Sequence, residues 1–332
     1  MFTSNLGIGP MSTEVIEAVF KYSHYHRKNL MLIASKNQID HSGGYVNGWN
    51  TKQYCGYLNE MKNKYSYSSV QNCRDHCGPG FTGNMSMDDI YKTIKTDIEN
   101  GFDLIHIDLC YFQGTNEERL NESKKAIEYC LKLNENIAIE IGTDENLGSK
   151  YSFNSIKEIG DELKFFKSFF DPEYFVVQTG SLVKEINQVG SFNKDFIEEC
   201  SNIIHSSGIK LKEHNADYLS THEIQRRKNI IDAMNIAPQL GVVQTSLVFN
   251  KCLIYGVRFD DFIEMVYQSG RWKKWMYKSK KNKQLCAHIA GHYHFASHEY
   301  KRIVEELNQH EDFHETIIET IMEVIDHYES SL

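Results

Sequence analysis

The chain has 332 residues, of which 41% are hydrophobic and 24% charged, a balance that excludes a disordered chain and is typical of a folded protein. The formal net charge of −9 gives no general attraction to nucleic acid or to an anionic membrane surface, so we expect neither as a partner. Any phosphate site must therefore be built locally.

The eight cysteines form no Cys-x-x-Cys pair, and several lie inside apolar patterns, which indicates reduced, buried thiols rather than a disulfide framework. Residues 1–22 lack the basic start and apolar run of a signal peptide. No stretch approaches the roughly 18 consecutive apolar residues of a membrane span. We therefore expect a soluble, cytoplasmic protein.

Short apolar runs that end in polar residues recur about every 30 to 35 residues and predict β-strands. The clearest runs are residues 30–35, 67–73, 104–108, 137–142, 174–178, 209–212 and 235–243. Apolar residues at helical spacing between them predict helices over 87–100, 116–133, 156–169, 194–206 and 222–234. We expect an eighth strand at 285–289 and terminal helices over 12–26 and 297–330.

This alternation of strand and helix favours a closed (β/α)8 TIM barrel of the α/β class over a shorter open sheet. No linker or composition shift divides the chain, so we expect one domain over residues 1–332 with a helical extension from about 297 to 332. In such barrels the active site lies at the C-terminal ends of the strands. The residues that end each apolar run are therefore the candidate site residues.

Those strand ends are polar. They supply Lys36, Asn37, Gln38, Asp75, His76, His106, Asp108, Glu140, Asp144, Gln178, Lys212, His214, Asp217, Gln239 and Gln244. Two histidines on different strands, His76 and His214, each with carboxylates nearby, suit a divalent metal that keeps an open coordination position. Either histidine alone is interpreted equally well as a turn residue.

Several of these residues also have structural interpretations. Asp75 is either a proton donor or a turn cap, and Glu140 either points into the barrel or forms a paired carboxylate. His106 lies in mid-strand and is interpreted as a core histidine. Lys212 shares strand parity with His214, so both should face the same side. A lysine facing the barrel interior can form a Schiff base, but an ion pair or a phosphate contact is favoured here.

Glycines follow three of the predicted strands, at Gly43-Gly44, Gly78-Pro79-Gly80 and Gly180-Ser181. Backbone amides in such loops can bind phosphate at the mouth of a barrel, although an ordinary tight turn is the favoured interpretation of each segment taken alone. The histidines at 288–298 are interpreted as a packed segment near the mouth rather than a metal site. The basic stretch at 271–283 is interpreted as a solvated helix face or, at Arg271, as a substrate-phosphate contact.

Six motifs occur in order between residues 30 and 244. They are Asn37-Gln38 with Gly43-Gly44-Tyr45, Asp75-His76 with Gly78-Pro79, Ile105-His106-Ile107-Asp108, Ile141-Gly142-Thr143-Asp144, Val176-Val177-Gln178-Thr179-Gly180 and Glu213-His214-Asn215-Ala216-Asp217-Tyr218. As a set they resemble the tagatose-bisphosphate aldolase accessory-subunit and ketose C4-epimerase family. That family is related to the class II metal-dependent aldolases, which are (β/α)8 barrels, and includes both non-catalytic aldolase partners and C4-epimerases.

The resemblance implies that His76 and His214 hold a divalent metal, with Glu140 or Asp144 adding a carboxylate. Zinc is expected, with manganese or nickel as alternatives. Asp75, Asp144 and Asp217 are the implied catalytic carboxylates. The implied substrate-binding residues are Asn37, Gln38, Gly43, Gly44, Asp108, Gln178, Gly180, Ser181, Lys212 and Gln244. The chain departs from the class II aldolases after the fifth predicted strand, where Gln178-Thr179-Gly180-Ser181 stands in place of a further metal histidine.

We therefore expect a metal-dependent aldolase that acts at C3–C4 of a ketose phosphate similar to tagatose bisphosphate. The ion would act as a Lewis acid and a carboxylate would move the hydroxyl proton. A C4-epimerase would use the same residues, and a non-catalytic partner subunit of an aldolase is the second alternative. The expected ligand is a phosphorylated sugar, and the expected protein partner is another copy of the chain or a second aldolase subunit.

Overall fold

A computed structural model describes residues 4–143, 155–276 and 282–332. Its strands are β1 (Leu6–Ile8), β2 (Asn29–Ser35), β3 (Ser69–Cys77), β4 (Leu104–Ile107), β5 (Ala138–Gly142), β6 (Tyr174–Val176), β7 (Val183–Lys184), β8 (Asn187–Gln188), β9 (Lys210–Glu213) and β10 (Ala233–Ile236). Its helices are α1 (Thr13–His26), α2 (Thr51–Lys64), α3 (Met87–Glu99), α4 (Asn116–Leu133), α5 (Ile156–Lys167), α6 (Lys194–Ser206), α7 (Thr221–Gln225), α8 (Pro238–Tyr255), α9 (Asp260–Ser269), α10 (Lys283–Ala290), α11 (His298–Leu307) and α12 (Phe313–Glu329). Two short 3-10 helices, η1 (Arg271–Lys274) and η2 (Gly291–His294), flank α10.

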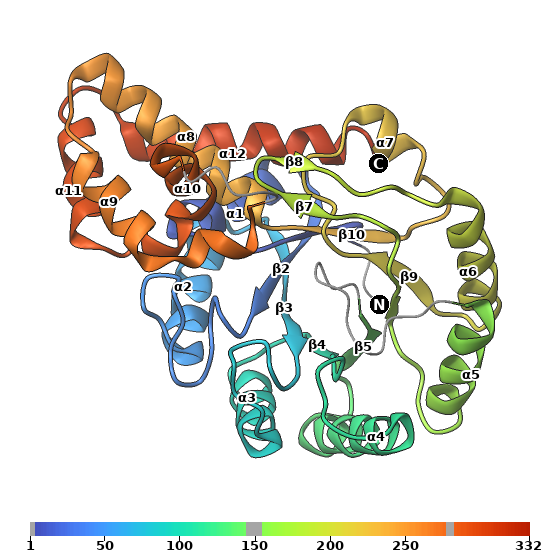
Figure 1. Cartoon of the computed structure of the whole chain (residues 1–332). Coiled ribbons are helices and arrows are strands. Elements are labelled where there is room, and N and C mark those ends of the chain that lie inside the picture. The colour runs from blue at the N-terminus through green and yellow to red at the C-terminus, as the bar shows by residue number, and fades with distance from the viewer. Residues whose placement is uncertain (1–3, 144–154, 277–281) are drawn as a thin grey trace.

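The parallel strands close into a barrel in the order β1, β10, β9, β6, β5, β4, β3, β2. Strands β7 and β8 form a separate antiparallel hairpin. Helices surround the barrel, and α8 to α11 gather at one side of it (Figure 1). The predicted (β/α)8 fold is confirmed.

The predicted eighth strand at 285–289 is wrong, because these residues belong to α10. The strand that completes the barrel is β1, which pairs with both β10 and β2. It is only three residues long, too short for its sequence to show an alternating pattern. Only its neighbours in the barrel identify it as a strand.

The end of the predicted seventh strand is also wrong. The structure has a strand only over β10, and helix α8 begins at Pro238. A proline at the first helical position is preorganised for a helix start, and this signal outweighs the apolar residues that follow. The predicted helix over 222–234 is limited to α7, and the predicted terminal helix over 297–330 divides into α11 and α12.

The barrel interior is apolar at one level and polar at the next. Its lower level is a buried cluster of Met31, Ile33, Cys73, Leu104, Tyr174 and Ala233. Because side chains alternate along a strand, the next inward-facing positions lie two residues further toward the C-terminal end. On three neighbouring strands these positions are Asp75, His106 and Glu140, all buried. The polar level therefore lies where barrel enzymes place their active sites.

All eight cysteines are buried and free of disulfide bonds, as the sequence predicts. Among the described residues, no helix combines the length and the apolar composition that crossing a membrane requires.

Helix α12 packs on α1 through a charged contact that predicts a pH dependence of stability. His314 Nε2 lies 3.2 Å from Glu17 Oε2, and its Nδ1 lies 3.6 Å from Glu14 Oε1. Hydrogen bonds to Glu14 and Glu17 raise the pKa of His314 from 6.5 to about 10. A raised pKa stabilises the fold fully below the unfolded-state value, and this contribution is lost as the pH rises through about 10.

We therefore expect His314→Gln to lower the free energy of unfolding near pH 6 and to have little effect above about pH 10. Urea unfolding of both proteins across this range measures the difference. The exposed His222, replaced in the same way, is the control and should show no such trend. An effect of His314→Gln that is independent of pH would contradict the ionic interpretation.

Candidate metal centre

Three imidazole rings meet at the mouth of the barrel. His76 lies near the end of β3, His106 lies on β4 and His214 directly follows β9. Their ring centroids are 5.0 Å apart for His76 and His214 and 5.2 Å apart for each of the other two pairs. Together with Asp75, the three rings offer ligand atoms that all lie within 4.8 Å of one another. The structure thus brings the two predicted histidines together and adds His106.

Hydrogen bonds orient the rings of His76 and His214. His76 Nδ1 lies 2.7 Å from Asp108 Oδ2, and His214 Nε2 lies 2.9 Å from Glu140 Oε1. An ionised carboxylate can only accept, so each of these nitrogens carries the proton. The other nitrogen of each ring, His76 Nε2 or His214 Nδ1, then has a lone pair available for a metal ion.

His106 is oriented in the same manner by the backbone. Its Nε2 donates to the carbonyl oxygen of Gly142 at 2.9 Å, which leaves the lone pair on Nδ1. That Nδ1 accepts the backbone N–H of His76 at 3.2 Å, a hydrogen bond that it would exchange for a bound ion, and it lies 3.4 Å from Asp75 Oδ1. All three rings therefore turn a basic nitrogen toward the same carboxylate.

Asp75 lies among the three basic nitrogens. Its carboxylate oxygens are 3.8 Å from His76 Nε2 and 3.8 Å from His214 Nδ1. Burial alone would raise the pKa of Asp75, but the neighbouring imidazoles of His76, His214 and His106 lower it well below its usual range. Asp75 is thus ionised at neutral pH.

Glu140 lies behind His214 and is held from two sides. Its Oε1 accepts the Nε2 proton of His214, and its Oε2 accepts from Lys212 Nζ at 2.7 Å. Burial would raise the pKa of Glu140, but Lys212 and His106 lower it to about 2. The predicted metal carboxylate therefore contacts the ring of a metal-site histidine, and the predicted substrate lysine forms an ion pair with it.

The donor set fits a divalent metal ion. His214 Nδ1 is buried and has no hydrogen-bond partner among the described residues. A buried basic nitrogen without a partner is costly, and a cation between it, His76 and His106 would satisfy it. Imidazole nitrogens with one nearby carboxylate are typical of zinc and also accept manganese or nickel.

The backbone at His76 is bent so that the ring turns into the barrel. His76 has a positive φ of 45°, and the pairing of β3 with β4 shifts register between Arg74 and Cys77. Such bulges redirect side chains next to functional sites. Arg74 anchors this segment from below through an ion pair with Asp97 at 2.6 Å, in which both side chains are fully buried.

A cavity of about 370 Å³ opens above this group. Asp75, His76, Asn37, Gln38 and Asn215 line it from the barrel. Its remaining wall includes Tyr111, Phe81 and residues of the C-terminal segment, namely Lys274, Trp275, His292 and Tyr293. This volume is sufficient for a sugar phosphate.

A second cavity of about 370 Å³ adjoins the first, and both are lined by Asn37 and Tyr45. Gly43, Gly44 and Arg271 also line the second cavity. The predicted glycine loop thus borders a space next to the metal group, and it faces a cation from the C-terminal segment.

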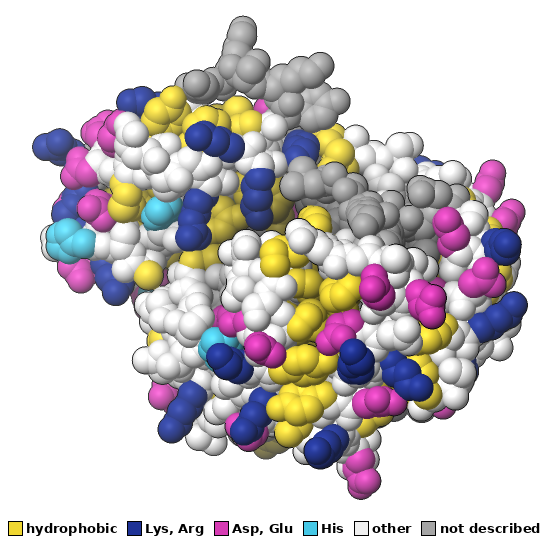
Figure 2. All heavy atoms as spheres, turned by 60° about the horizontal axis from the view of Figure 1, so that its bottom comes forward, with side chains coloured by type: hydrophobic (Ala, Val, Ile, Leu, Met, Phe, Trp, Pro, Cys, Tyr) yellow, Lys and Arg dark blue, Asp and Glu magenta, His cyan; other side chains and the backbone are white. Residues whose placement is uncertain are grey.

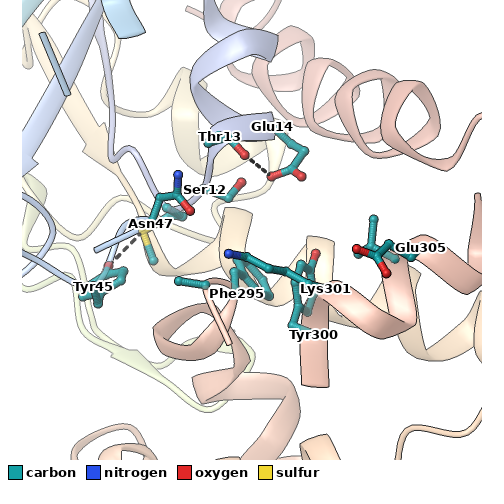
Figure 3. A pocket seen from close by; sticks show the side chains of 12 residues that line it. Ser12, Thr13, Glu14, Tyr45, Asn47, Phe295, Tyr300, Lys301 and Glu305 are labelled. Atoms are coloured by element: carbon teal, nitrogen blue, oxygen red, sulfur yellow. Dashed lines mark hydrogen bonds between the residues drawn. The ribbon is translucent and has the colours of Figure 1, made fainter. Parts of the chain in front are cut away.

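A third cavity, of about 220 Å³, lies on the other side of Tyr45, between the start of α1 and helix α11 (Figure 3). Ser12, Glu14 and Lys301 are among its lining residues. Tyr45 and Met11 line both this cavity and the one above the metal group, and the Tyr45 hydroxyl lies 3.5 Å from Met11 Sδ. These two side chains therefore separate the two spaces.

Two predicted residues take part in contacts away from the metal group. Gln244 lies on α8, where its side-chain amide contacts Ser12 at 2.7 Å and Tyr300 at 2.8 Å. Ser181 Oγ donates to the buried Glu213 at 2.5 Å. The structure does not place Gln244 or Ser181 on the lining of the cavity above the metal group.

The other predicted residues have varied positions. Gly180 accepts the backbone N–H of Ser191 in the loop around β7 and β8, and Gln178 is half-buried after β6. Asp217 Oδ1 accepts the backbone amides of Ala237 and Gln239 at the start of α8. Burial raises the pKa of Asp217 to about 7, although both amides act in the opposite direction. Asp144 lies outside the described residues.

Asp108, predicted as a substrate contact, instead orients a ring of the metal group. Its Oδ2 contacts His76 Nδ1 and accepts from Thr143 Oγ1 at 3.0 Å, while its Oδ1 accepts the Cys110 amide. Removing such an outer partner typically weakens metal binding about 10- to 100-fold. We expect this loss for Asp108→Asn, measured by competition with a chelator. The exposed Asp88, changed to Asn, should leave the metal affinity unchanged.

The sequence interpretation missed His106 as a member of the metal group. The available signal was its parity: His106 lies two residues from Asp108, so both side chains face the same side of β4. The histidines at 288–298 were placed in a packed segment near the mouth, and His292 does line the cavity there together with Tyr293. The sequence interpretation had no signal for Trp275 in the same wall.

No protein-family model matches the chain. In structure the chain is similar to a Sinorhizobium meliloti protein described as a probable tagatose 6 phosphate kinase, with 14% identity, a TM-score of 0.84 and coverage of 99% of this chain and 100% of that one. It is also similar to the fructose-bisphosphate aldolase of Campylobacter jejuni, with 12% identity, a TM-score of 0.64 and coverage of 98% and 90%. A third similar structure is the fructuronate-tagaturonate epimerase UxaE of Cohnella laeviribosi, with 11% identity, a TM-score of 0.69 and coverage of 98% and 81%. The chain therefore has the barrel fold of these aldolase and epimerase structures.

Proposed function

We propose that this protein is a metal-dependent enzyme of the aldolase type that breaks or forms the C3–C4 bond of a phosphorylated ketose. The observation that carries the proposal is the metal group itself. Three imidazoles turn a basic nitrogen toward one ionised carboxylate, and each ring is fixed by its own acceptor. A histidine buried for packing alone would not require two others beside it.

His76, His106 and His214 would hold the ion, with zinc as the expected metal and manganese or nickel as alternatives. When bound, the ion supplies Lewis-acid catalysis for the cleavage of a bond next to a ketone. Asp108 and Glu140 keep the rings of His76 and His214 in the required orientation.

Asp75 is the residue that would move the proton. Its carboxylate is ionised, lines the cavity and lies beside the metal-site nitrogens. In the cleavage direction it accepts the proton of the C4 hydroxyl while the C3–C4 bond breaks and C4 becomes an aldehyde. Asn37 and Gln38 line the same cavity and would bind substrate hydroxyls.

A ketose C4-epimerase is the second candidate, and the shape of the cavity favours it specifically. Lys274, Trp275 and Tyr293 form a wall over the mouth of the barrel. A wall in this position would retain the aldehyde fragment, which could then turn its other face and recombine. Asp75 would return the proton to the new C4 hydroxyl.

The geometry disfavours a Schiff-base mechanism. Lys212 is 1% exposed, and its Nζ is paired with Glu140 and lies 4.9 Å from the centre of the Tyr174 ring. A nucleophilic lysine must be neutral and accessible to the substrate ketone. An ion-paired lysine below the metal group fulfils neither condition.

Incubation of the purified protein with ketose monophosphates and bisphosphates, with and without a chelator, tests the proposal. Trioses that form only without the chelator would indicate the aldolase, and a C4 epimer would indicate the epimerase. Activity that survives chelation and is trapped by borohydride at Lys212 would contradict the metal mechanism. Activity that appears only after a second aldolase subunit is added would identify a non-catalytic partner.

A further inference from the structure

One wall of the cavity above the metal group comes from the C-terminal segment rather than from the barrel strands. Lys274 and Trp275, at the end of η1, line this wall, and so do His292 and Tyr293 of η2. Arg271, at the start of η1, lines the adjoining cavity. Lys and Arg side chains gather on the C-terminal helices beside a hollow in the surface (Figure 2). We call these five residues the C-terminal wall.

The two cations of the C-terminal wall are held by aromatic rings. The Arg271 guanidinium lies 4.9 Å from the centre of the Tyr293 ring, and Lys274 Nζ lies 4.5 Å from that of Trp275 and 5.8 Å from that of Tyr293. Neither cation forms an ion pair with a carboxylate among the described residues. Cations stacked on aromatic faces keep their positive charge available to a ligand in the cavity.

The carboxylates that line the adjoining cavity form their ion pairs with residues other than Arg271. Asp40 is paired with Lys36 at 3.0 Å, and Asp89 is paired with both Lys36 and His41. The positive charge of the C-terminal wall therefore has no directly paired carboxylate among the described residues. An anionic group on a ligand would balance it.

His292 adds an unpartnered polar group to the same wall. It is 1% exposed, it lines the cavity, and neither ring nitrogen has a hydrogen-bond partner among the described residues. The ring is packed against Gly241, where an added Cβ would lie 2.6 Å from the His292 Cβ, and against the ring of Tyr45. Burial, together with Lys274, His294 and Arg271, lowers the pKa of His292 to about 3.

A neutral imidazole offers one donor and one acceptor, which is the complement of a hydroxyl group. Two buried nitrogens without partners are costly, and a ligand in the cavity would satisfy at least one of them. The ring therefore has the chemistry and the position to bind a sugar hydroxyl.

We propose that the C-terminal wall recognises the end of the substrate that lies away from the metal group. Lys274 and Arg271 bind a terminal anionic group, either a phosphate or a carboxylate, and His292 binds a hydroxyl of the chain between that group and the reacting carbons. This assignment rests on the proposed function for the position of the reacting end. It makes the C-terminal helices part of the active site rather than a peripheral extension.

Calorimetric titration of the metal-loaded protein with D-tagatose 6-phosphate, D-tagatose and D-tagaturonate tests the wall. A charge-assisted hydrogen bond corresponds to an affinity change of about 10- to 100-fold, so we expect Lys274→Ala to raise the Kd of the phosphorylated ketose at least about tenfold. The Kd of the unphosphorylated ketose should change less than about twofold. Arg271→Ala should act in the same direction.

Lys273→Ala is the matched control, because Lys273 lies on the same 3-10 helix but does not line the cavity. If Lys274→Ala weakens the binding of tagaturonate alone, the bound anion is a carboxylate. If it weakens the binding of the phosphorylated ketose alone, the bound anion is a phosphate. Equal affinities of the Lys274→Ala and Lys273→Ala proteins for both anionic ligands would overturn the proposal. So would a wild-type protein that binds neither anionic ligand more tightly than D-tagatose.

His292→Phe keeps an aromatic ring and removes both nitrogens. We expect it to weaken all three ligands to the same extent, with His292→Asn restoring part of the affinity. Unchanged affinities would contradict the role of His292, and a melting temperature equal to that of the wild type would show that the variant is folded.

The outcomes of this experiment distinguish a wrong assignment of the C-terminal wall from a wrong proposed function. If the chain has no aldolase or epimerase activity, the effect of Lys274→Ala on binding of the anionic ligands persists. If the wall is assigned wrongly, turnover and its sensitivity to chelation persist, while Lys274→Ala and Lys273→Ala bind alike.

Discussion

Replacing His214 with alanine is expected to remove the bound divalent ion and to lower turnover by about a thousandfold. His214 Nδ1 is buried and has no partner among the described residues, and the ring is oriented by Glu140. Without it, two imidazoles and Asp75 remain, which is too few neutral nitrogen donors for a tightly held ion. A Lewis acid contributes several kcal/mol to such a transition state, and each 1.4 kcal/mol is about tenfold in rate.

Metal content per chain and turnover of the same ketose phosphate measure this loss. His222→Ala, which removes an exposed imidazole from α7, is the control for the substitution itself. A His214→Ala protein that folds normally and retains a full equivalent of metal would show that the three rings do not form the metal site.

The second large effect concerns stability. Arg74 and Asp97 form a two-pronged ion pair, with Nε 2.6 Å from Asp97 Oδ2 and Nη2 2.8 Å from Oδ1, and both residues are 0% exposed. Removing one partner leaves a buried charge without compensation, which typically costs about 3–5 kcal/mol. We expect Asp97→Ala to lower the free energy of unfolding by this amount, as measured in urea.

The exposed pair Lys95–Glu99 on the same helix provides the comparison, and Glu99→Ala should cost less than about 1 kcal/mol. The double variant Arg74→Met with Asp97→Leu removes both charges and should recover much of the stability. If Asp97→Ala were as stable as Glu99→Ala, Arg74 would have to be compensated by another group.

The Asp97→Ala substitution should also weaken metal binding, because it changes the backbone that positions the metal group. Arg74 donates to the carbonyl oxygens of Ala34 and Ile39, and it directly precedes Asp75 in the chain. We infer that this pair holds the bulge in which His76 adopts its positive φ. Weaker metal binding by the Asp97→Ala protein is therefore expected along with its lower stability.

Regular elements with a strong local pattern could be predicted from the sequence. Helices α4 and α6 were predicted with the observed bounds, and β2 with nearly the same bounds, because their apolar residues repeat at the period of the element they form. Strand β1 could not be predicted, and the start of α8 was missed although Pro238 marks it. A three-residue strand has no measurable period, and α8 resembles a strand in its apolar run because it packs against α10, α11, α12 and η2.

The site residues likewise fall into those that the sequence predicted and those that only the tertiary structure identified. The sequence by itself predicted that His76 and His214 lie at the ends of two strands of a parallel barrel, because the C-terminal ends of all strands of such a barrel meet at one rim. Only the tertiary structure decided that His106 joins them, that Glu140 and Asp108 orient rings, and that Lys274 and His292 line one and the same cavity. Contacts between residues far apart in the chain depend on how helices pack on the barrel, and no local spacing encodes that packing.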